Sequence, residues 1–438
     1  MPDTIAAIAT ARGKGAIGVV KVSGPQSPDI AREITGQHLP PRMSRYLAFK
    51  DVDDQPIDRG VALLFQGPDS YTGEDVLELQ AHGNQFVLDQ LLQRVIALGA
   101  RHARPGEFTE RAFLNDKLDL AQAEAVADLI DSDSTEAARA AVRSLSGDFS
   151  QQVSDITDRL LHLRVYIEAA LDFAEEEIDF LADESLTIKL LELDQLIDNT
   201  LARATEGRVL REGLNVVIVG QPNVGKSSLL NALTQQQSAI VTDIAGTTRD
   251  VLREHIVIDG LPIHLVDTAG IRESADKVEQ EGVRRAREQV KTADLVLAIG
   301  VAGCNTTLDD TLFLDADSTV LNIYNKADLN PLNEQQIGLP VSAKTGDGID
   351  ALKAAIKLHA GYQQSPEGAF MARRRHLRAL EQTREHVVIA RSHLLENSAG
   401  ELAAEELRAA QLSLSQITGE FSADDLLGEI FGKFCIGK

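Results

Sequence analysis

The chain has 438 residues, which at about 150 residues per domain predicts roughly three domains. Its 43% apolar and 25% charged residues are ordinary for a globular protein and exclude collagenous and disordered classes. No apolar run approaches the ~20 residues of a membrane-spanning helix, so we expect no membrane association. With only Cys304 and Cys435, a disulfide framework is excluded and a cytoplasmic location is expected.

The net charge of −24 is unevenly distributed. Residues 119–210 carry 7 basic and 21 acidic side chains, whereas residues 366–438 carry 9 and 11. Phosphate contacts dominate affinity for nucleic acid, so a chain that held RNA by itself would normally present a basic surface. We therefore expect any RNA substrate to be held largely by a partner.

Residues 1–117 are predicted to form an α+β domain. Ala16–Ser23 and Val61–Phe65 have the composition of strands, and Asn84–Leu98 repeats apolar side chains at helical spacing. Pro105-Gly106 forms a turn that closes the region.

Helical periodicity begins at Leu118, persists to about residue 207, and returns from Ala372 through Leu412. The two apolar stripes of the first part are Leu118, Ala121, Ala125 and Leu129, and Ile156, Leu160, Leu163, Ile167 and Leu171. We therefore predict a discontinuous α-helical domain made of residues 118–210 and 366–438.

Residues 211–365, between these two parts, are predicted to form an inserted α/β domain with a mostly parallel sheet. Short β-branched runs alternate with helical segments, which is the pattern of strands joined by crossover helices. The runs are Val216–Val219, Ile263–Val266, Leu295–Ile299, Thr319–Tyr324 and Leu339–Val341.

Gly220–Ser227 (GQPNVGKS) fits the pattern G-x-x-x-x-G-K-[ST] and lies between a predicted strand and a predicted helix. Glycines allow backbone N–H groups to surround phosphate oxygens. Lys226 can reach the β- and γ-phosphates, and the Ser227 hydroxyl can ligate Mg²⁺ at the positive end of the helix dipole. The sequence therefore predicts a nucleoside triphosphate site.

Three further motifs follow predicted strands, at the sheet edge where open α/β sheets bind ligands. Asp267–Gly270 (DTAG) offers an acid to the Mg²⁺ shell and an N–H to the γ-phosphate. In Asn325–Asp328 (NKAD), the Asp328 carboxylate can accept two hydrogen bonds from guanine, and Ser342–Lys344 (SAK) is suited to supporting the base. Thr242–Asp250 (TDIAGTTRD) is predicted to be a switch loop.

Within that loop, Thr248 is expected to close on Mg²⁺ and the γ-phosphate. The predicted GTP-binding residues are Asn223, Val224, Gly225, Lys226, Ser227, Ser228, Thr242, Asp243, Ile244, Ala245, Gly246, Thr247, Thr248, Asp267, Thr268, Ala269, Gly270, Asn325, Lys326, Asp328, Ser342, Ala343 and Lys344.

Ile271 follows the Asp-x-x-Gly motif, where many small GTPases carry a glutamine that orients the attacking water. An aliphatic side chain cannot polarise water, so another group must do so. Glu279 is one candidate, with an exposed helix glutamate as the alternative. Arg249 and Arg272 are candidates for charge stabilisation, with salt bridges of the switch loop as an equal alternative.

Together with Tyr71–Gly83 (YTGEDVLELQAHG), Arg104–Ala123 (RPGEFTERAFLNDKLDLAQA) and Cys435–Lys438 (CIGK), these motifs resemble the MnmE (TrmE) family of tRNA-modifying GTPases over essentially the whole chain. The resemblance implies a homodimer formed through folate-binding N-terminal domains, a helical domain and an inserted Ras-like G domain. It also implies a flavoprotein partner, MnmG, which brings FAD and forms a heterotetramer with the dimer.

The implied reaction adds an aminomethyl or carboxymethylaminomethyl group to C5 of wobble uridine in tRNA. A tetrahydrofolate derivative, in the 5,10-methylene or 5-formyl form, provides the one-carbon unit. Hydrolysis of GTP, stimulated by K⁺, drives a conformational cycle.

The resemblance also implies roles for single residues. Positions matching the family's K⁺ site are Asn223, Thr242, Ile244 and Thr247, and Glu279 matches its water-activating glutamate. Positions matching its folate site are Lys21, Glu78, Lys117 and Lys438. Lys21 replaces the family's usual arginine, and Cys435 matches a cysteine whose role, catalytic or structural, the resemblance leaves open.

Two other classes of protein share part of this pattern. A ribosome-assembly GTPase has the same G-domain motifs but usually adds a basic RNA-binding module, which the charge balance of residues 366–438 disfavours. A pure nucleotide switch would bind partners without one-carbon chemistry. Folate binding by the N-terminal region distinguishes the switch from the modification enzyme.

Overall fold

The computed structural model describes residues 3–172, 184–221, 223–234, 253–267, 291, 293–304, 319–362, 368–396, 399–419, 424–435 and 437. The chain divides into two compact units, and each is described by itself. One unit comprises Met1–Ala127, Val153–Thr157 and Arg408–Lys438, and the other comprises Asp128–Gln152 and Asp158–Leu407. Among the described residues, no helix is long and apolar enough to cross a bilayer.

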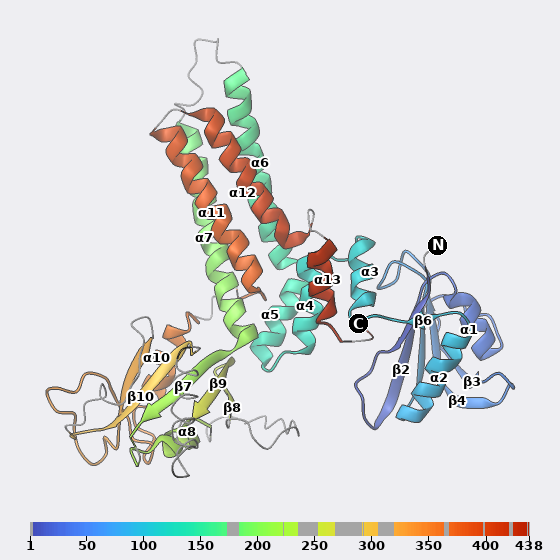
Figure 1. Cartoon of the computed structure of the whole chain (residues 1–438), viewed down its shortest axis with the longest axis horizontal. Coiled ribbons are helices and arrows are strands. Elements are labelled where there is room, and N and C mark those ends of the chain that lie inside the picture. Colours follow the sequence, from blue (N-terminus) through green and yellow to red (C-terminus); the bar gives the residue numbers. More distant parts are fainter. Residues whose placement is uncertain are drawn as a thin grey trace, which may run out of the picture. The chain divides into compact units, whose positions relative to one another are not determined.

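The first unit contains a six-stranded sheet with the strand order β3-β4-β5-β2-β1-β6 (Figure 1). All neighbouring strands in it are antiparallel except β1 and β6. The strands are β1 (Ile5–Ile8), β2 (Gly15–Ser23), β3 (Arg45–Lys50), β4 (Pro56–Phe65), β5 (Val76–Gly83) and β6 (Arg101–His102).

Helices α1 (Ser27–Thr35) and α2 (Gln85–Ala97) pack against this sheet. Asn84 begins α2 as predicted, because its side chain accepts a hydrogen bond from the Phe86 N–H and caps the helix. The apolar core between helices and sheet includes the buried side chains of Ile30, Phe49 and Leu79.

The end of the chain packs on the helices that follow this sheet. Helix α13 (Asp424–Gly432) lies against α3 (Glu107–Leu114). Phe431 belongs to a buried cluster with Leu120 at the start of α4 (Leu120–Ile130), and its ring centre lies 6.3 Å from that of Phe113.

Outside its sheet, the second unit contains α5 (Thr135–Leu145), α7 (Glu184–Glu212), α11 (Arg374–Leu395) and most of α6 (Asp148–Asp172) (Figure 1). Helix α12 (Gly400–Thr418) begins in this unit and continues into the first. The predicted stripe of α6 is buried at Ile156, Leu160, Leu163 and Ile167. Ion pairs of Arg391 with Asp194, and of Arg384 with Asp198 at 2.8 Å, join α11 to α7. The helix predicted from Ala372 through Leu412 is divided, because α11 ends at Leu395 and α12 begins at Gly400.

The second sheet has the strand order β12-β11-β10-β7-β9-β8, in which only β8 runs antiparallel to its neighbour. This confirms the predicted mostly parallel sheet, while the antiparallel β8 was not predicted. Its elements are β7 (Leu214–Gly220), α8 (Lys226–Thr234), β8 (Arg253–Ile258), β9 (Leu261–Asp267), β10 (Leu295–Val301), β11 (Val320–Asn325), β12 (Leu339–Pro340) and α10 (Ile349–His359).

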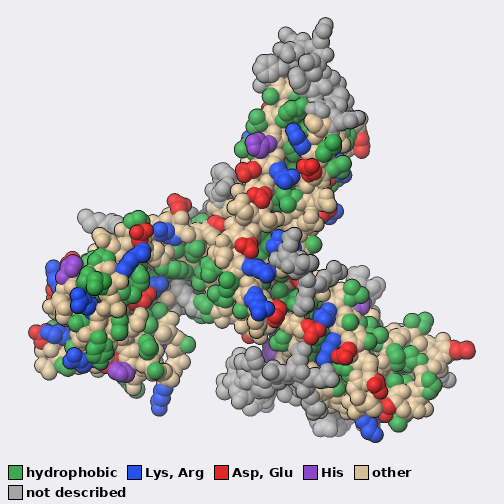
Figure 2. Space-filling view, turned by 180° about the vertical axis from the view of Figure 1, so that it is seen from behind, with side chains coloured by type: hydrophobic (Ala, Val, Ile, Leu, Met, Phe, Trp, Pro, Cys, Tyr) green, Lys and Arg blue, Asp and Glu red, His purple; other side chains and the backbone are tan. Residues whose placement is uncertain are grey.

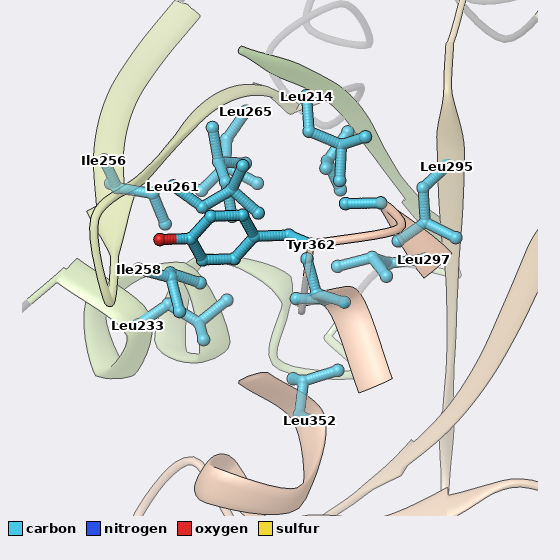
Figure 3. Close-up of a cluster of buried hydrophobic side chains, with 14 of the residues drawn as sticks. Leu214, Leu233, Ile256, Ile258, Leu261, Leu265, Leu295, Leu297, Leu352 and Tyr362 are labelled. Atoms are coloured by element: carbon cyan, nitrogen blue, oxygen red, sulfur yellow. The ribbon is translucent and has the colours of Figure 1, made fainter. Parts of the chain in front are cut away.

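One face of this sheet forms a large apolar core. Figure 3 shows the Tyr362 ring among side chains from several strands and helices, including Ile258, Leu261, Leu297 and Leu352. The predicted nucleotide motifs lie at the carboxyl ends of strands of this sheet, where open α/β sheets bind ligands.

Candidate functional site

The loop between β7 and α8 approaches its neighbouring strands closely at two glycines. A Cβ at Gly220 (φ +153°) would lie 2.4 Å from the Ile299 carbonyl oxygen. At Gly225 (φ +96°) a Cβ would lie 2.3 Å from the Asn325 amide nitrogen. Glycine is therefore required at both positions by the close packing of the backbone.

The Lys226 ammonium is held by this loop. The side chain is 8% exposed, and its Nζ donates to the carbonyl oxygens of Gly220 (2.9 Å) and Gln221 (3.0 Å). Ser227 and Ser228 are exposed in the first turn of α8. A lysine, hydroxyl groups and a helix N-terminus at one loop form a favourable environment for phosphate.

Asn325 connects the three described nucleotide motifs. It is 2% exposed, and its amide nitrogen donates to the Val224 carbonyl oxygen at 2.9 Å. Its Oδ1 accepts from the N–H groups of Lys326 (2.8 Å) and Ala343 (3.1 Å). The Lys326 Nζ donates to the Asn223 carbonyl oxygen at 2.9 Å. The fold therefore brings the predicted phosphate-binding loop Gly220–Ser227 (the P-loop), the NKAD motif and the SAK motif to one edge of the sheet.

Asp328 is exposed beside the buried Ser342. The Ser342 hydroxyl donates to Asp328 Oδ1 at 2.8 Å. Asp328 Oδ2 makes no hydrogen bond with any residue that the structure describes. Because each carboxylate oxygen can accept about two hydrogen bonds, the group is oriented by Ser342 and still has acceptor capacity for a ligand.

Several predicted site residues lie outside the described residues: Thr242, Asp243, Ile244, Ala245, Gly246, Thr247, Thr248, Arg249, Thr268, Ala269, Gly270, Arg272, Glu279 and Lys438. Asp267 is the last residue of β9. The roles assigned to all of these residues stay predictions.

Lys21 and Glu78 lie directly opposite each other on the neighbouring strands β2 and β5. The Lys21 Nζ is 4.3 Å from the centre of the Tyr71 ring and 5.2 Å from that of Phe108. Burial lowers the pKa of Lys21, and the charge of Glu78 opposes this shift. A cation between two aromatic rings and next to a carboxylate suits a flat ligand that carries both hydrogen-bond donors and negative charge.

Tyr71 and Phe108 were not predicted as site residues from the sequence. The Tyr71 hydroxyl forms a 2.9 Å hydrogen bond with the Thr109 hydroxyl, and burial raises the pKa of Tyr71. Both rings stand at or near the start of stretches that carried the family resemblance, Tyr71–Gly83 and Arg104–Ala123. The presence of aromatic residues within those stretches was the signal by which the two rings could have been predicted as site residues.

The other predicted folate residues are less closely connected. The exposed Lys117 side chain makes no hydrogen bond or ion pair with any described residue. In the C-terminal tail, the carbonyl oxygen of the exposed Cys435 accepts from the Gly106 N–H at 3.3 Å. A Cβ at Gly437 would lie 2.5 Å from the Ile8 carbonyl oxygen, and the preceding residue of β1, Ala7, is opposite Lys21.

A group of ion pairs that the sequence did not reveal fixes α3. Glu107 bonds to Arg101 (2.5 Å) and Arg111 (3.1 Å), and Arg111 also donates to Glu74 at 3.0 Å. Burial opposes ionisation of Glu107, but hydrogen bonds from Arg101, the Arg104 N–H and Arg111 outweigh it and lower its pKa to about 2. Phe108 follows Glu107 directly, so this network also positions the ring beside Lys21.

Two family models match the chain. The model for the GTP-binding protein TrmE N-terminus matches residues 4–117, and the model for the MnmE helical domain matches residues 120–435. The chain belongs to the MnmE family of tRNA modification GTPases. Its membership agrees with the resemblance seen in the sequence motifs.

Similar proteins of this family cover the full chain. The tRNA modification GTPase MnmE of Vibrio cholerae serotype O1 (strain ATCC 39315 / El Tor Inaba N16961) is 52% identical over 454 residues, which is 100% of this chain and 99% of that protein. The MnmE of Pasteurella multocida (strain Pm70) is 52% identical over 452 residues, covering 100% of both. Among solved structures, the FeoB G domain of Methanococcus jannaschii is 25% identical over 34% of this chain and 97% of its own, with a TM-score of 0.25.

Proposed function

We propose that the chain hydrolyses GTP and, with an MnmG-type flavoprotein that binds FAD, adds an aminomethyl or carboxymethylaminomethyl group to C5 of wobble uridine in tRNA. Family membership supports GTP hydrolysis in tRNA modification. The observation that carries the nucleotide part is the set of hydrogen bonds by which Asn325 joins the P-loop to the NKAD and SAK motifs.

Guanine selection is assigned to Asp328. Its carboxylate accepts from the N1–H and 2-amino groups of guanine, whereas adenine presents no such pair of donors. The hydrogen bond from Ser342 fixes the carboxylate orientation before the base arrives. On the phosphate side, Lys226 exchanges its bonds to the Gly220 and Gln221 carbonyl oxygens for phosphate oxygens.

Two cations fit the described loop residues. The exposed Ser227 hydroxyl would hold Mg²⁺, together with Thr248, and the ion would neutralise charge on the β- and γ-phosphates. The exposed Asn223 side chain has no partner among the described residues, so its amide oxygen is available to K⁺ with Thr242, Ile244 and Thr247. Glu279 is assigned to orient the attacking water in place of Ile271.

A tetrahydrofolate derivative, in the 5,10-methylene or 5-formyl form, is assigned to the N-terminal region and provides the one-carbon unit. Glu78 would accept from the N–H donors of the pterin ring, and Lys21, Lys117 and Lys438 would neutralise the carboxylates of the glutamate tail. The location of Lys21 opposite Glu78 and beside Tyr71 supports this assignment.

The assembly proposed is a homodimer through residues 1–117, with a helical domain of residues 118–210 and 366–438 and a G domain of residues 211–365. In Figure 2, basic and acidic side chains are interspersed over the described residues of the face shown. This distribution and the net charge of −24 support a complex in which the partner holds most of the tRNA. Its compartment is proposed to be the cytoplasm.

The decisive test is the wobble-uridine modification profile of tRNA from cells that lack this protein. Wild-type protein should restore the modification, whereas Asp328→Asn and Glu78→Ala should not. Full restoration by Glu78→Ala would remove the folate assignment and favour a pure nucleotide switch. Failure of the wild-type protein to restore any modified uridine would overturn the proposed function.

A further inference from the structure

The β8–β9 hairpin directly links two of the predicted nucleotide motifs. β8 begins at Arg253, just after the predicted switch loop Thr242–Asp250, and β9 ends at Asp267, the first residue of the Asp-x-x-Gly motif. The two strands are paired from Arg253↔Val266 to Ile258↔Leu261. A hairpin paired along its whole length moves as a unit, so a displacement at its nucleotide end is carried to its turn.

That turn is held by α5, a helix outside the sheet domain. The Ser134 hydroxyl donates to the Gly260 carbonyl oxygen at 2.8 Å. Gly260 has a φ of +90°, and a Cβ there would lie 2.5 Å from Cγ of Glu136. Ser134 also begins α5, because its hydroxyl oxygen accepts from the Ala137 N–H at 3.1 Å. One side chain therefore caps the helix and binds the turn.

Buried apolar side chains of α5 and of the hairpin also belong to one hydrophobic cluster. Ala137 and Ala141 of α5 belong to the same buried apolar cluster as Ile258 and Leu261 of the hairpin. The β-hairpin and α5 consequently share one core in addition to the hydrogen bond at the turn.

Helices α10 and α7 also make hydrogen bonds with the hairpin. The Lys357 Nζ on α10 bonds to Asp259 Oδ2 at 2.5 Å, and the Tyr362 hydroxyl donates to the Asp259 carbonyl oxygen at 3.3 Å. In Figure 3 the Tyr362 ring lies beside Ile256, Ile258 and Leu261. In the middle of β9, His264 Nε2 donates to the carbonyl oxygen of Glu212, the last residue of α7, at 3.0 Å.

We propose that Ser134 is a positioning residue that couples the nucleotide state of the G domain to helix α5 through the turn of the β8–β9 hairpin. The lysine and tyrosine contacts to Asp259 lie within the sheet domain and its C-terminal helix. The Ser134 hydroxyl makes a hydrogen bond that passes from the turn to α5, and the Glu136 side chain of α5 lies close to the same turn. This inference rests on the GTPase activity proposed above.

The test separates the two roles of Ser134 by substitution. Ser134→Asp keeps the acceptor that caps α5 but has no hydrogen to donate to Gly260. Ser134→Thr keeps both functions. Ser132→Ala is the matched control, because the Ser132 hydroxyl donates to the Asp128 carbonyl oxygen at 2.6 Å and makes no hydrogen bond with the described residues of the hairpin.

The measurement is amide hydrogen exchange of the full chain bound to GDP and to GDP with aluminium fluoride. In the wild-type chain, the first turns of both α8 and α5 should exchange at different rates in the two states, by about fivefold or more for α5. Ser134→Asp should lose the α5 difference and keep the α8 difference, while Ser134→Thr and Ser132→Ala should keep both. GTP turnover of Ser134→Asp should stay within about twofold of wild type, and tRNA modification should fall about fivefold.

A wild-type α5 difference that persists in Ser134→Asp would overturn the proposal, as would an α5 that does not respond in the wild-type chain. An α8 that does not respond in the wild-type chain would overturn the nucleotide assignment itself, and the inference with it. If Ser132→Ala lost as much tRNA modification as Ser134→Asp, the loss would reflect a general structural effect of substitutions near α5. That result would contradict a role specific to Ser134.

Discussion

The candidate nucleotide site and the candidate folate site are held together in different ways. In the nucleotide site, side chains of separate motifs bond to one another, as Asn325 does to Val224 and Ser342 does to Asp328. In the candidate folate site, Lys21 and Glu78 are neighbours on the sheet, but the Lys117 side chain makes no hydrogen bond or ion pair with any described residue. The first site is prepared within one fold, whereas the residues predicted for the second come from a sheet, the segment after α3 and the end of the chain.

This difference in how the two sites are held together predicts how each of them responds to amino-acid substitutions. A prepared site selects its ligand by fixed hydrogen-bond groups, so single substitutions alter specificity strongly. A site collected from several elements depends on the structures that position them. For the candidate folate site these are the ion pairs around Glu107 and the packing of α13 on α3.

The largest effect is expected from Asp328→Asn. A site built to hydrogen-bond a substrate group rejects an analogue that lacks it by roughly 10⁴-fold. The variant should lose GTP and gain xanthosine triphosphate, whose 2-oxo group accepts where guanine donates. Competition binding with GTP, ATP and xanthosine triphosphate measures this, and tight binding of ATP by the unmutated chain would contradict the assignment.

Glu107→Gln tests the support of the folate site. Removing one partner of a buried ion pair costs about 3 kcal/mol, which is roughly 100-fold faster amide exchange in α3. The exposed pair of Arg104 with Glu110 at 2.9 Å offers the control, since Glu110→Gln should cost less than about 1 kcal/mol. Similar exchange of α3 in both variants would show that the Glu107 network does not fix this helix.

The same network predicts a loss of stability in acid. The pKa of Glu107 is lowered from 4.5 to about 2, so its ionised form stabilises the fold above pH 4.5. This contribution is lost as the pH falls toward about 2. Protection of α3 amides should therefore decline over that interval in the wild-type chain. It should decline less in Glu107→Gln, where Asp3, whose pKa is also lowered to about 2 by hydrogen bonds from Arg101 and Arg111, still becomes protonated.

The assignment of K⁺ to the nucleotide site predicts a smaller effect, which concerns the rate of GTP turnover. GTP turnover at saturating GTP should rise about tenfold or more in KCl over NaCl at equal ionic strength, because a positive group near the transferring phosphoryl lowers the barrier. Asn223→Ala should remove this difference and leave nucleotide binding nearly intact. Glu279→Ala should stop hydrolysis without preventing K⁺-dependent pairing of G domains. Equal GTP turnover in KCl and NaCl would contradict the cation assignment and would favour Arg249 and Arg272 as the residues that stabilise charge on the phosphates.

The smallest effect concerns Lys21→Arg, which restores the family's usual residue. A guanidinium can stack between the Tyr71 and Phe108 rings and bind a carboxylate with two N–H groups. One added hydrogen bond of about 1 kcal/mol corresponds to about fivefold tighter folate binding. Weaker binding by the variant in calorimetry would show that Lys21 does not face the anionic part of the ligand.

The sequence predicted the G-domain architecture well because its signals are local. β-branched runs identified β7, β9, β10 and β11, and the P-loop pattern identified the start of α8. It did not predict β8, whose short run Arg253–Ile258 carries charged and histidine residues. Strand β5 was also not predicted, although it carries Glu78.

Contacts between distant segments could not be predicted in this way. The bond of Asn325 to Val224, the pairing of Glu107 with Arg101 and Arg111, and the contact of Gly437 with β1 follow from tertiary packing. The family resemblance assigned Lys21 and Glu78 but no role to Tyr71 and Phe108, whose ring centres lie 4.3 and 5.2 Å from the Lys21 Nζ.

The claim that the chain itself binds the one-carbon donor is tested most directly by calorimetric titration of the full-length protein with 5-formyltetrahydrofolate. The account predicts saturable binding by the wild-type chain and about 30-fold or greater loss in Glu78→Ala, since the substitution removes a charged acceptor of two hydrogen bonds. Amide exchange of β2 and α2 in the variant should match wild type, which shows that the sheet around Glu78 is folded, and GTP binding by the same samples should be unchanged. Equal folate affinity in the two proteins, or no folate binding by the wild-type chain, would contradict the account.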